Sequence, residues 1–374
     1  MNALVVGVPT EVKPDERRIA LTPDGVRELA SRDVDVLVQS GAGAGIGLSD
    51  GDYAGAGAEV VTSASEVWGR AGLVCKVKEP QPDEFSLLRD DLTLFTYLHL
   101  AAYPEVARAL CAAGTTGIAY ETVMRPDGQL PLLAPMSEIA GRMAVQAGAR
   151  FLEAPQGGRG VLMSGAPGVR PARVAVLGAG NVGWNAAIIA AGMGAEVTLL
   201  DLNLDRLRAL ESTLPGRITT LASNRGSVER SVAESDLVVG AVLVAGGRAP
   251  TVVTEAMVAA MRPGSVIADV AIDQGGCIET ARETSHHDPV YKVHGVQHYC
   301  VGNIPGAVPV TATAALTNAT LPYVVALASL GSDAACRRDP VLAGGLNTRA
   351  GAVVHAVVAG SLGVDAPDPD TAAA

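Results

Sequence analysis

A glycine-rich turn near the middle of the chain is the feature that most directly suggests chemistry. Gly178, Gly180 and Gly183 form a G-x-G-x-x-G pattern, which follows the apolar run RVAVL and opens a small-residue helix. In such turns one glycine permits the tight bend, one lets the backbone approach a pyrophosphate, and one allows close helix packing. Asp201 ends the next apolar run, where a carboxylate can bind ribose hydroxyls. The pattern predicts a dinucleotide site, and the charge of Asp201 favours NAD over NADP.

Two aspartates mark another apolar segment, SVIADVAID. Asp273 ends this segment and is followed by Gln274 and two glycines. We expect Asp273 to lie at the carboxyl edge of a sheet, where doubly wound folds bind ligands. Asp269 lies four residues earlier, an even spacing that puts both side chains on the same face of a strand. The pattern alone therefore leaves open which of the two carboxylates is exposed there.

A histidine and several cations follow apolar runs in the first third of the chain. His99 closes LTLFTYL, where a lone histidine is usually a core residue but can also serve as an acid or base. Lys76 and Lys78 flank a valine before KEP, and Arg17 and Arg18 precede IAL. Such cations are most often solvated, although a basic residue at a strand end can hold a carboxylate.

The histidines near residue 290 raise the question of a metal site. His286, His287 and Asp288 are adjacent, and His294 and His298 follow. The neighbouring Thr, Ser and Pro residues favour a surface loop, and no ligand set with zinc spacing follows. We therefore expect no metal.

The elements that must position these residues are short strands alternating with helices. This alternation predicts a parallel α/β sheet in the first third and a second one after Arg173. Between them, residues 137–153 read as one long helix with Ser137 as its N-cap after Pro135. After Pro305 the pattern becomes Ala-rich and helical. The predicted fold class is α/β, with two doubly wound domains.

Composition narrows the classes of function. A length of 374 residues suggests two or three domains, and the net charge of −11 works against nucleic-acid or anionic-membrane partners. Five cysteines without a C-x-x-C pair fit a reducing cytoplasm, in which Cys277 and Cys300 would be inert thiols. We expect no signal peptide, and no uncharged apolar stretch long enough to span a bilayer.

Several strings occur in an order that resembles one enzyme family. They are GVPTEVKPDERRIALTP, KVKEP, FTYLHLA, LPLLAPMSEIAGR, QGGRGVLMSG, DVAIDQGG and ALTNATLPY. Together they closely resemble the NAD-dependent L-alanine dehydrogenases over nearly the whole chain. The related nucleotide-binding subunit of proton-translocating transhydrogenase is similar in fold and in part of the opening segment.

The resemblance implies reversible oxidative deamination of L-alanine to pyruvate and ammonium with NAD. It implies that Arg18 and Lys78 hold the substrate carboxylate, that His99 is the general acid/base, and that Asp273 assists at the reacting amine or hydroxyl. It adds cofactor contacts at Ser137, Ser223, Val301 and Asn303 to those of Gly178, Gly180, Gly183 and Asp201.

The resemblance also implies a domain arrangement and an assembly. A central Rossmann NAD-binding domain, residues 132–305, would be inserted into a substrate domain made of residues 1–131 and 306–374. The expected protein is a cytoplasmic homohexamer whose partners are small molecules. Ala245, Arg248 and Val310 depart from the family pattern, which leaves the preference for other small substrates such as glyoxylate open. The alternative function is a non-catalytic NAD(H)-binding subunit of a transhydrogenase.

Overall fold

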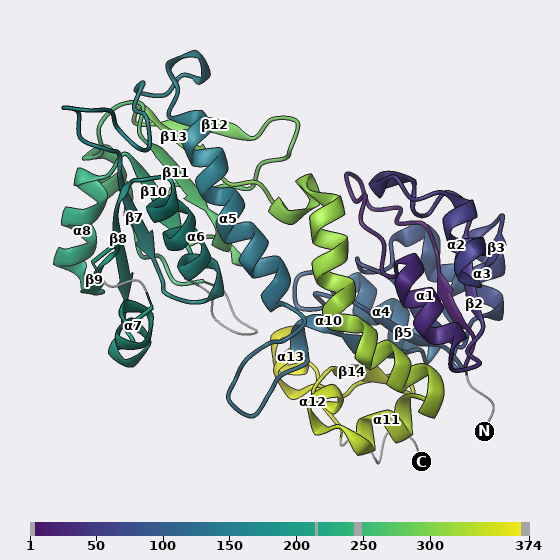
Figure 1. Cartoon of the computed structure of the whole chain (residues 1–374). Coiled ribbons are helices and arrows are strands. Elements are labelled where there is room, and N and C mark those ends of the chain that lie inside the picture. Colours follow the sequence, from purple (N-terminus) through teal and green to yellow (C-terminus); the bar gives the residue numbers. More distant parts are fainter. Residues whose placement is uncertain (1–3, 214–215, 243–248, 368–374) are drawn as a thin grey trace. The chain divides into compact units, whose positions relative to one another are not determined.

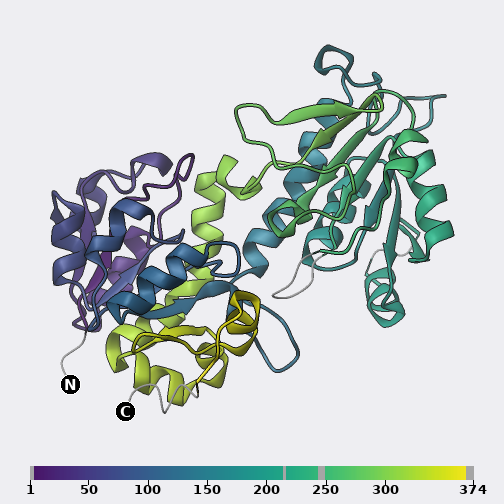
Figure 2. The same cartoon turned by 180° about the vertical axis from the view of Figure 1, so that it is seen from behind.

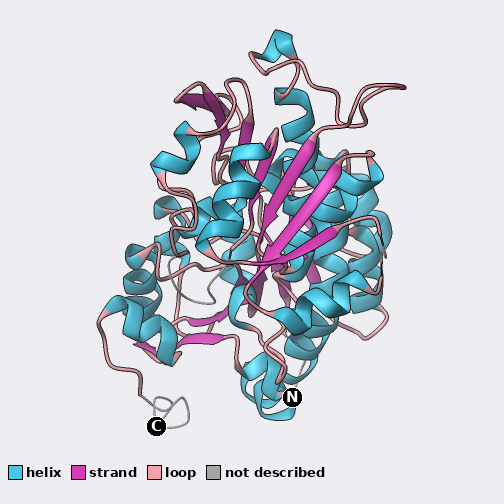
Figure 3. Ribbon diagram, turned by 90° about the vertical axis from the view of Figure 1, so that its left-hand side faces the viewer, coloured by secondary structure: helices cyan, strands magenta, loops and turns pink. Residues whose placement is uncertain are grey.

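Two compact units make up the chain, each with its own β-sheet. The computed structural model describes residues 4–213, 216–242 and 249–367. Residues 1–136 and 308–374 form the first unit, and residues 137–307 form the second. Figure 3 distinguishes the strands of the sheets from the surrounding helices. The predicted fold class is confirmed.

The sheet of the first unit has, within the described residues, eight strands in the order β15-β14-β6-β5-β4-β1-β2-β3. Strands β1 to β6 are parallel, and β14 and β15 extend one edge in antiparallel fashion. The order reverses between β1 and β4, which is the kind of position where doubly wound sheets bind ligands. The strands are β1 (Val6–Val8), β2 (Val36–Gln39), β3 (Glu59–Val61), β4 (Leu73–Cys75), β5 (Thr93–Thr96), β6 (Thr116–Ala119), β14 (Leu346–Arg349) and β15 (Ala352–Val353).

Helices pack on this first sheet. Trp68 of α3 and Leu110 of α4 share one buried cluster with Val74 and Leu94 of the strands, while α10 contacts α1 and β4. Most of these helices begin with Pro, Ser or Thr in the positions that favour a helix start. The helices are α1 (Pro23–Ala30), α2 (Asp50–Ala56), α3 (Ala64–Arg70), α4 (Pro104–Ala113), α10 (Pro309–Leu330), α11 (Ser332–Arg338), α12 (Pro340–Ala343) and α13 (Ala356–Leu362).

The sheet of the second unit repeats the same winding. Its order is β12-β13-β11-β10-β7-β8-β9, parallel except for the edge strand β12. The parallel strands, numbered by their own sequence, follow the order 6-5-4-1-2-3 of a Rossmann fold, which reverses between β7 and β10. The strands are β7 (Arg173–Leu177), β8 (Glu196–Asp201), β9 (Thr219–Ala222), β10 (Leu237–Gly240), β11 (Val266–Asp269), β12 (Val290–Val293) and β13 (Val296–Tyr299).

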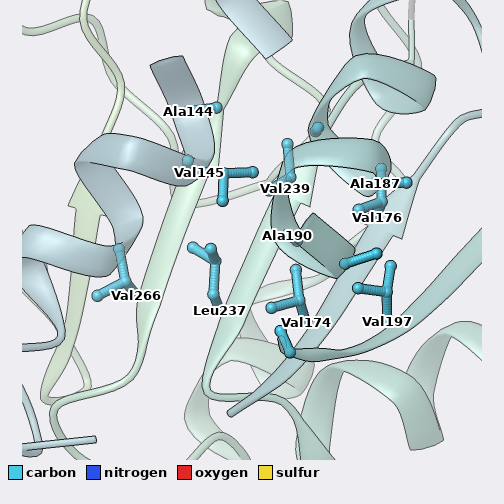
Figure 4. Close-up of a cluster of buried hydrophobic side chains, with 14 of the residues drawn as sticks. Ala144, Val145, Val174, Val176, Ala187, Ala190, Val197, Leu237, Val239 and Val266 are labelled. Atoms are coloured by element: carbon cyan, nitrogen blue, oxygen red, sulfur yellow. The ribbon is translucent and has the colours of Figure 1, made fainter. Parts of the chain in front are cut away.

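Helices cover both faces of the second sheet. Figures 1 and 2 show α5 and α6 on one side of the strands and α8 on the other. Val174 and Val176 face the small residues of α5 and α6 (Figure 4), whereas Ala175 between them faces α8 and α9. This alternation follows from the two-residue period of a strand. The helices are α5 (Ala134–Phe151), α6 (Asn181–Gly192), α7 (Leu204–Glu211), α8 (Arg225–Glu234) and α9 (Glu255–Ala259).

Two sequence-based expectations about elements are wrong. Helix α5 begins at Ala134, so Ser137 lies in its first turn and is not its N-cap. Pro135 is tolerated there because the first-turn N–H groups have no acceptor within the helix. The region after Pro305 is not wholly helical either, since β14 and β15 add to the first sheet. The pairing of β14 with β6 is a long-range contact, which local pattern does not reveal.

Helix α10 corrects a third expectation. This 22-residue helix is uncharged, and by length and composition alone it could cross a membrane. Leu316, Val324 and Leu327 of the helix are nevertheless buried, and Thr313 accepts the backbone N–H of Ile19 at 3.2 Å. A buried core helix passes the same test of length and apolarity, so this helix is weak evidence for a membrane span.

The glycine loop offers a matched pair of substitutions that tests the fold. A Cβ on Gly183 would lie 1.7 Å from the carbonyl oxygen of Gly178, whereas one on Gly180 would meet nothing within 4 Å. We expect Gly183→Ala to lower the free energy of unfolding by about 1–3 kcal/mol through overpacking. Gly180→Ala should cost less than about 1 kcal/mol, mainly as a weaker helix cap. Urea denaturation measures both values, and equal losses would contradict the β7–α6 packing described here.

Candidate functional site

Four loops of the first unit lie at the same edge of its sheet. They follow the neighbouring parallel strands β1, β4, β5 and β6, and they carry Arg18, Lys78, His99 and Glu121, respectively. The charges of Arg18 and Lys78 both act on the imidazole of His99, so three of the predicted site residues share one cluster. This edge contains the reversal of strand order, where ligands of doubly wound folds bind.

Arg18 is buried and held by a neighbouring acid. Its Nε donates to Glu16 Oε1 at 2.7 Å, and its Nη2 donates to Oε2 at 2.5 Å. Burial by itself would raise the pKa of Glu16, but the hydrogen bonds and charge of Arg18 lower it to about 2. Glu16 therefore stays ionised and occupies the Nε–Nη2 edge of the guanidinium. Nη1 of Arg18 lies 3.0 Å from Met136 Sδ.

The two lysines after β4 have different surroundings. Lys76 is buried, with Nζ 3.3 Å from Glu11 Oε2 and 2.9 Å from Glu84 Oε1. Burial alone would lower the pKa of Lys76, but the two carboxylates raise it. Lys78 is half-buried, and Glu11 accepts the backbone N–H groups of Val77 and Lys78 at 2.5 and 3.4 Å. Lys76 is thus part of a buried ion network, and Lys78 is the less buried of the two lysines.

His99 is held in an unusual backbone conformation. It lies three residues beyond β5 with φ of +47°, in the left-handed region that non-glycine residues rarely occupy. Its backbone N–H donates to Glu121 Oε1 at 2.6 Å, and its Nδ1 lies 3.9 Å from the same oxygen. The imidazole also stacks on the Tyr97 ring at a centroid distance of 5.7 Å. Glu121 and Tyr97 therefore orient the ring.

The electrostatic environment keeps His99 neutral in the free protein. Burial and the positive charges of Lys78, Lys13 and Arg18 together lower its pKa to about 3. Lys13 is itself held by Glu79 at 2.5 Å and lies over the Tyr103 ring. An anion bound among these cations would offset their charge and raise the pKa of His99.

The glycine loop of the second unit has the shape that a dinucleotide needs. Gly178 has φ of +98°, and a Cβ there would lie 2.5 Å from the carbonyl oxygen of Ala241. Gly180 precedes the first residue of α6, in open surroundings, so the backbone is accessible at the helix N-terminus. The exposed N–H groups and the positive end of the helix dipole suit a pyrophosphate.

Asp201 lies at the end of β8, as predicted. Its carboxylate accepts the backbone N–H of Ala179 at 2.6 Å and that of Asn203 at 2.7 Å, and Arg206 Nη1 is 3.5 Å away. Asp201 therefore ties the glycine loop to the next strand. The side chain is 11% exposed, so part of the carboxylate remains at the surface.

The other predicted cofactor residues lie in separate elements of the second unit. Ser223 follows β9, and its backbone N–H donates to the Asp201 carbonyl at 2.9 Å. Val301 and Asn303 follow β13, so they share with Ser223 the carboxyl edge of the sheet. Ser137 lies in the first turn of α5.

Asp273 is the exposed aspartate of the DVAID segment, as expected, but it does not end the strand. Strand β11 ends at Asp269, and Asp273 lies in the following 3-10 helix η5 (Val270–Gln274). Asp269 is fully buried, so the alternative in which it is the exposed partner is wrong. Asp273 is exposed, in the loop beyond the strand. The strand ends early because the Asp269 side chain caps the new helix through the Ala271 N–H.

The remaining candidates do not form a further site. Within the described residues no group of three potential metal ligands occurs. His286 contacts the Asn303 carbonyl at 3.1 Å, and His294 contacts Glu255 at 2.8 Å. Ala245 and Arg248 lie outside the described residues, and Val310 is exposed near the start of α10.

Three acids at the site were missed from the sequence. Glu11, Glu16 and Glu121 are polar residues in loops, where a solvated side chain is the ordinary expectation. The available signal was position, since Glu121 follows the apolar run TGIAY much as His99 follows LTLFTYL. Burial of these carboxylates is visible only in the folded unit.

Comparison with known families agrees with this geometry. The family model described as "Alanine dehydrogenase/PNT, N-terminal domain" matches residues 7–140, and that described as "Alanine dehydrogenase/PNT, C-terminal domain" matches residues 144–356. The chain belongs to the alanine dehydrogenase/PNT family. The C-terminal domain of this family is the nucleotide-binding domain, and its alanine dehydrogenases use NAD.

Individual relatives cover nearly the whole chain. An alanine dehydrogenase from Mycolicibacterium smegmatis is 54% identical over 99% of both chains, and one from Bacillus subtilis is 52% identical over 97% of this chain and 96% of its own. A solved L-alanine dehydrogenase structure superimposes with a TM-score of 0.92 at 53% identity, covering 96% of this chain and 99% of its own. A transhydrogenase from Sinorhizobium meliloti gives 0.79 at 27% identity, covering 94% and 99%.

The cation cluster makes a testable prediction about His99. Lys78→Met removes a positive charge beside the imidazole, so we expect the pKa of His99 to rise from its low value. NMR of protein labelled with 13C-histidine measures the titration, and a His99→Asn spectrum assigns the resonance. Lys292→Met, which removes a lysine of the second unit, should leave the pKa of His99 unchanged. An unchanged or lower pKa in Lys78→Met would show that Lys78 does not act on the ring.

Proposed function

We propose that this protein is an NAD-dependent L-alanine dehydrogenase. The reaction converts L-alanine, NAD and water into pyruvate, ammonium, NADH and a proton, and it runs in both directions. The observation that carries the proposal is the buried Arg18 and the half-buried Lys78 beside a neutral, oriented His99. Two cations suit the carboxylate of a small amino acid, and a neutral imidazole suits proton transfer at its reacting carbon.

The proposed roles of the two parts follow the fold. Residues 1–131 and 306–374 form the substrate domain, and residues 132–305 form the Rossmann NAD-binding domain. Gly178, Gly180 and Gly183 hold the pyrophosphate, for which a Cβ-free loop at a helix N-terminus is suited. Asp201 binds the ribose hydroxyls. The additional cofactor contacts are Ser137, Ser223, Val301 and Asn303.

NAD, when bound, accepts the hydride that leaves Cα of the substrate. Arg18 and Lys78 hold the carboxylate, which fixes the orientation of Cα. The substrate ammonium first loses a proton, loss of the hydride then leaves a cationic imine, and water adds to its carbon. His99 takes the proton from that water as it attacks and returns it to the amine, where Asp273 assists. Ammonia leaves as the carbonyl forms and the remaining hydroxyl proton is lost.

The charge of the substrate prepares His99 for this step. In the free protein burial, together with the cations, keeps the ring neutral, which is the form a general base requires. The bound carboxylate offsets the charges of Arg18 and Lys78, which raises the pKa of His99. Substrate binding thereby favours the protonated ring more than the free protein does.

The alternative function is the NAD(H)-binding subunit of a transhydrogenase. The 27% identity to the transhydrogenase structure is about half the identity to the alanine dehydrogenases, and the arrangement around His99 has the groups that deamination requires. We therefore favour the dehydrogenase. A cytoplasmic location, a homohexamer and the absence of nucleic-acid, membrane and metal partners are part of the same proposal.

A turnover assay tests the function directly. We expect L-alanine with NAD to give NADH, followed by absorbance, and pyruvate with ammonium and NADH to give the reverse. NADP should be poorer by about tenfold or more because Asp201 repels its 2′-phosphate. His99→Asn, which retains a hydrogen bond but cannot carry a proton, should lower kcat by about 100-fold with NADH binding retained. Wild-type protein that binds NADH without turnover of alanine, pyruvate or glyoxylate would support the transhydrogenase alternative.

Two adjacent arginines provide a matched test of substrate binding. Arg18 is buried in the site and Arg17 is exposed. Arg18→Lys loses the planar guanidinium, so we expect kcat/KM for alanine and pyruvate to fall by about tenfold or more with nearly unchanged NADH affinity. Arg17→Lys should leave steady-state kinetics unaffected. The opposite pattern would mean that the substrate contact is assigned to the wrong arginine.

A further inference from the structure

A fully buried carboxylate lies directly beneath the loop that carries Asp273. Asp269 has no exposed surface, and it accepts three backbone N–H groups: Ala271 at 3.1 Å, Cys277 at 2.9 Å and Ile278 at 3.1 Å. The first donor lies before Asp273 in the sequence, and the other two lie after it. One side chain thus joins both ends of the loop from Val270 to Gly276.

Neighbouring residues make room for this carboxylate. A Cβ on Gly240, in the adjacent strand β10, would lie 2.9 Å from Asp269 Oδ1 and 2.7 Å from Cys277 Sγ. A Cβ on Gly276 would lie 2.8 Å from Asp269 Oδ2. The Cys277 thiol also donates to Oδ1 at 3.5 Å. The carboxylate of Asp269 is thus surrounded by two glycines and a thiol, and a side chain at either glycine would collide with it.

The loop itself has a conformation that needs support. Gly275 and Gly276 both have positive φ, +89° and +76°. Fixing two glycines in one conformation costs backbone entropy. The outer side is held by the segment before α9, where Ala249 N–H donates to the Gln274 carbonyl at 3.0 Å and Val252 N–H donates to the Cys277 carbonyl at 2.8 Å. The inner side of the loop is bound to the Asp269 carboxylate.

We infer that Asp269 is a positioning residue, which fixes the loop from Val270 to Gly276 and thereby places the Asp273 carboxylate for the reaction. The inference rests on the proposed function, because it assumes that Asp273 assists at the reacting amine. A buried charge is costly and an apolar residue of similar size is often as stable, so stability alone is a poor reason for an acid here. A carboxylate is needed to accept three N–H groups at once.

A double-mutant cycle separates positioning from simple stabilisation. Asp269→Asn puts amide hydrogens against backbone N–H groups, so we expect kcat for alanine oxidation to fall by about tenfold or more, as for a displaced reacting group. The KM for alanine should change little, because Arg18 and Lys78 are untouched. In a background of Asp273→Asn, adding Asp269→Asn should lower kcat by no more than about twofold, since both changes remove the same contribution.

The same sheet contains a matched control. Asp236, just before β10, is 1% exposed and accepts the Arg173 N–H at 2.9 Å and an Arg159 hydrogen bond at 2.5 Å. It lies at the amino ends of the strands, away from Asp273. Asp236→Asn should lower the thermal midpoint but leave kcat of the folded enzyme unchanged, alone and combined with Asp273→Asn.

Each outcome decides between the possibilities. A full kcat in folded Asp269→Asn, or losses that multiply with those of Asp273→Asn, would overturn the positioning role. Should Asp273→Asn alone have no effect, the proposed role of Asp273 fails, and the inference fails with it. Absence of alanine turnover in the wild type would instead overturn the proposed function. If Asp269→Asn does not fold, Gly240→Ala serves in its place, because its Cβ displaces the carboxylate without removing the charge.

Discussion

Hydrogen bonds from backbone N–H groups to largely buried carboxylates are the interaction on which the carboxyl edges of both sheets depend. Glu121 holds the backbone at His99, Glu11 holds it at Lys78, and Asp201 holds the glycine loop at Ala179. Loops at a strand end leave N–H groups without ladder partners, and a buried unpaired N–H is costly. An acid in the next loop satisfies these donors, and in doing so it fixes the functional residue beside it.

These acids also account for the cations around His99. Arg18 and Lys13 each contact a buried or nearly buried glutamate, which offsets the cost of removing a positive charge from water. The glutamates are mostly turned toward the backbone or toward the cations, and the imidazole experiences a net positive field. Burial and this positive field both lower the pKa of the imidazole. In the proposed function this charge balance suits a small carboxylate, whose binding would raise the pKa of His99.

The two units reach this result through the same winding. Both parallel sheets have the order 6-5-4-1-2-3, so each has one reversal where loops diverge and leave space for a ligand. In the first unit the loops near the reversal of strand order carry charged side chains. In the second unit they carry glycines and a helix N-terminus. The same architecture thus provides a place for a carboxylate in one unit and for a pyrophosphate in the other.

The sequence by itself determined the features that depend on local pattern. Alternating apolar runs predicted the α/β class. The spacing of Gly178, Gly180 and Gly183 with Asp201 predicted the nucleotide-binding edge of the second sheet. Both patterns are local, since each repeats or is complete within about 25 consecutive residues. The resemblance to alanine dehydrogenases singled out Arg18, Lys78 and His99, a choice that local pattern had left open.

Tertiary structure alone decided which charged residues are buried and what they bind. Lys76 and Lys78 have the same type and nearly the same position, yet only contacts with Glu11 and Glu84 make the first structural. Asp269 and Asp273 would lie on the same face of a continuous strand. They differ in burial because β11 ends four residues early, where the Asp269 side chain caps the following helix. The strands β14 and β15 joined the first sheet through pairing across more than 200 residues. Burial and strand pairing of this kind depend on contacts between residues far apart in the sequence, which a local pattern does not predict.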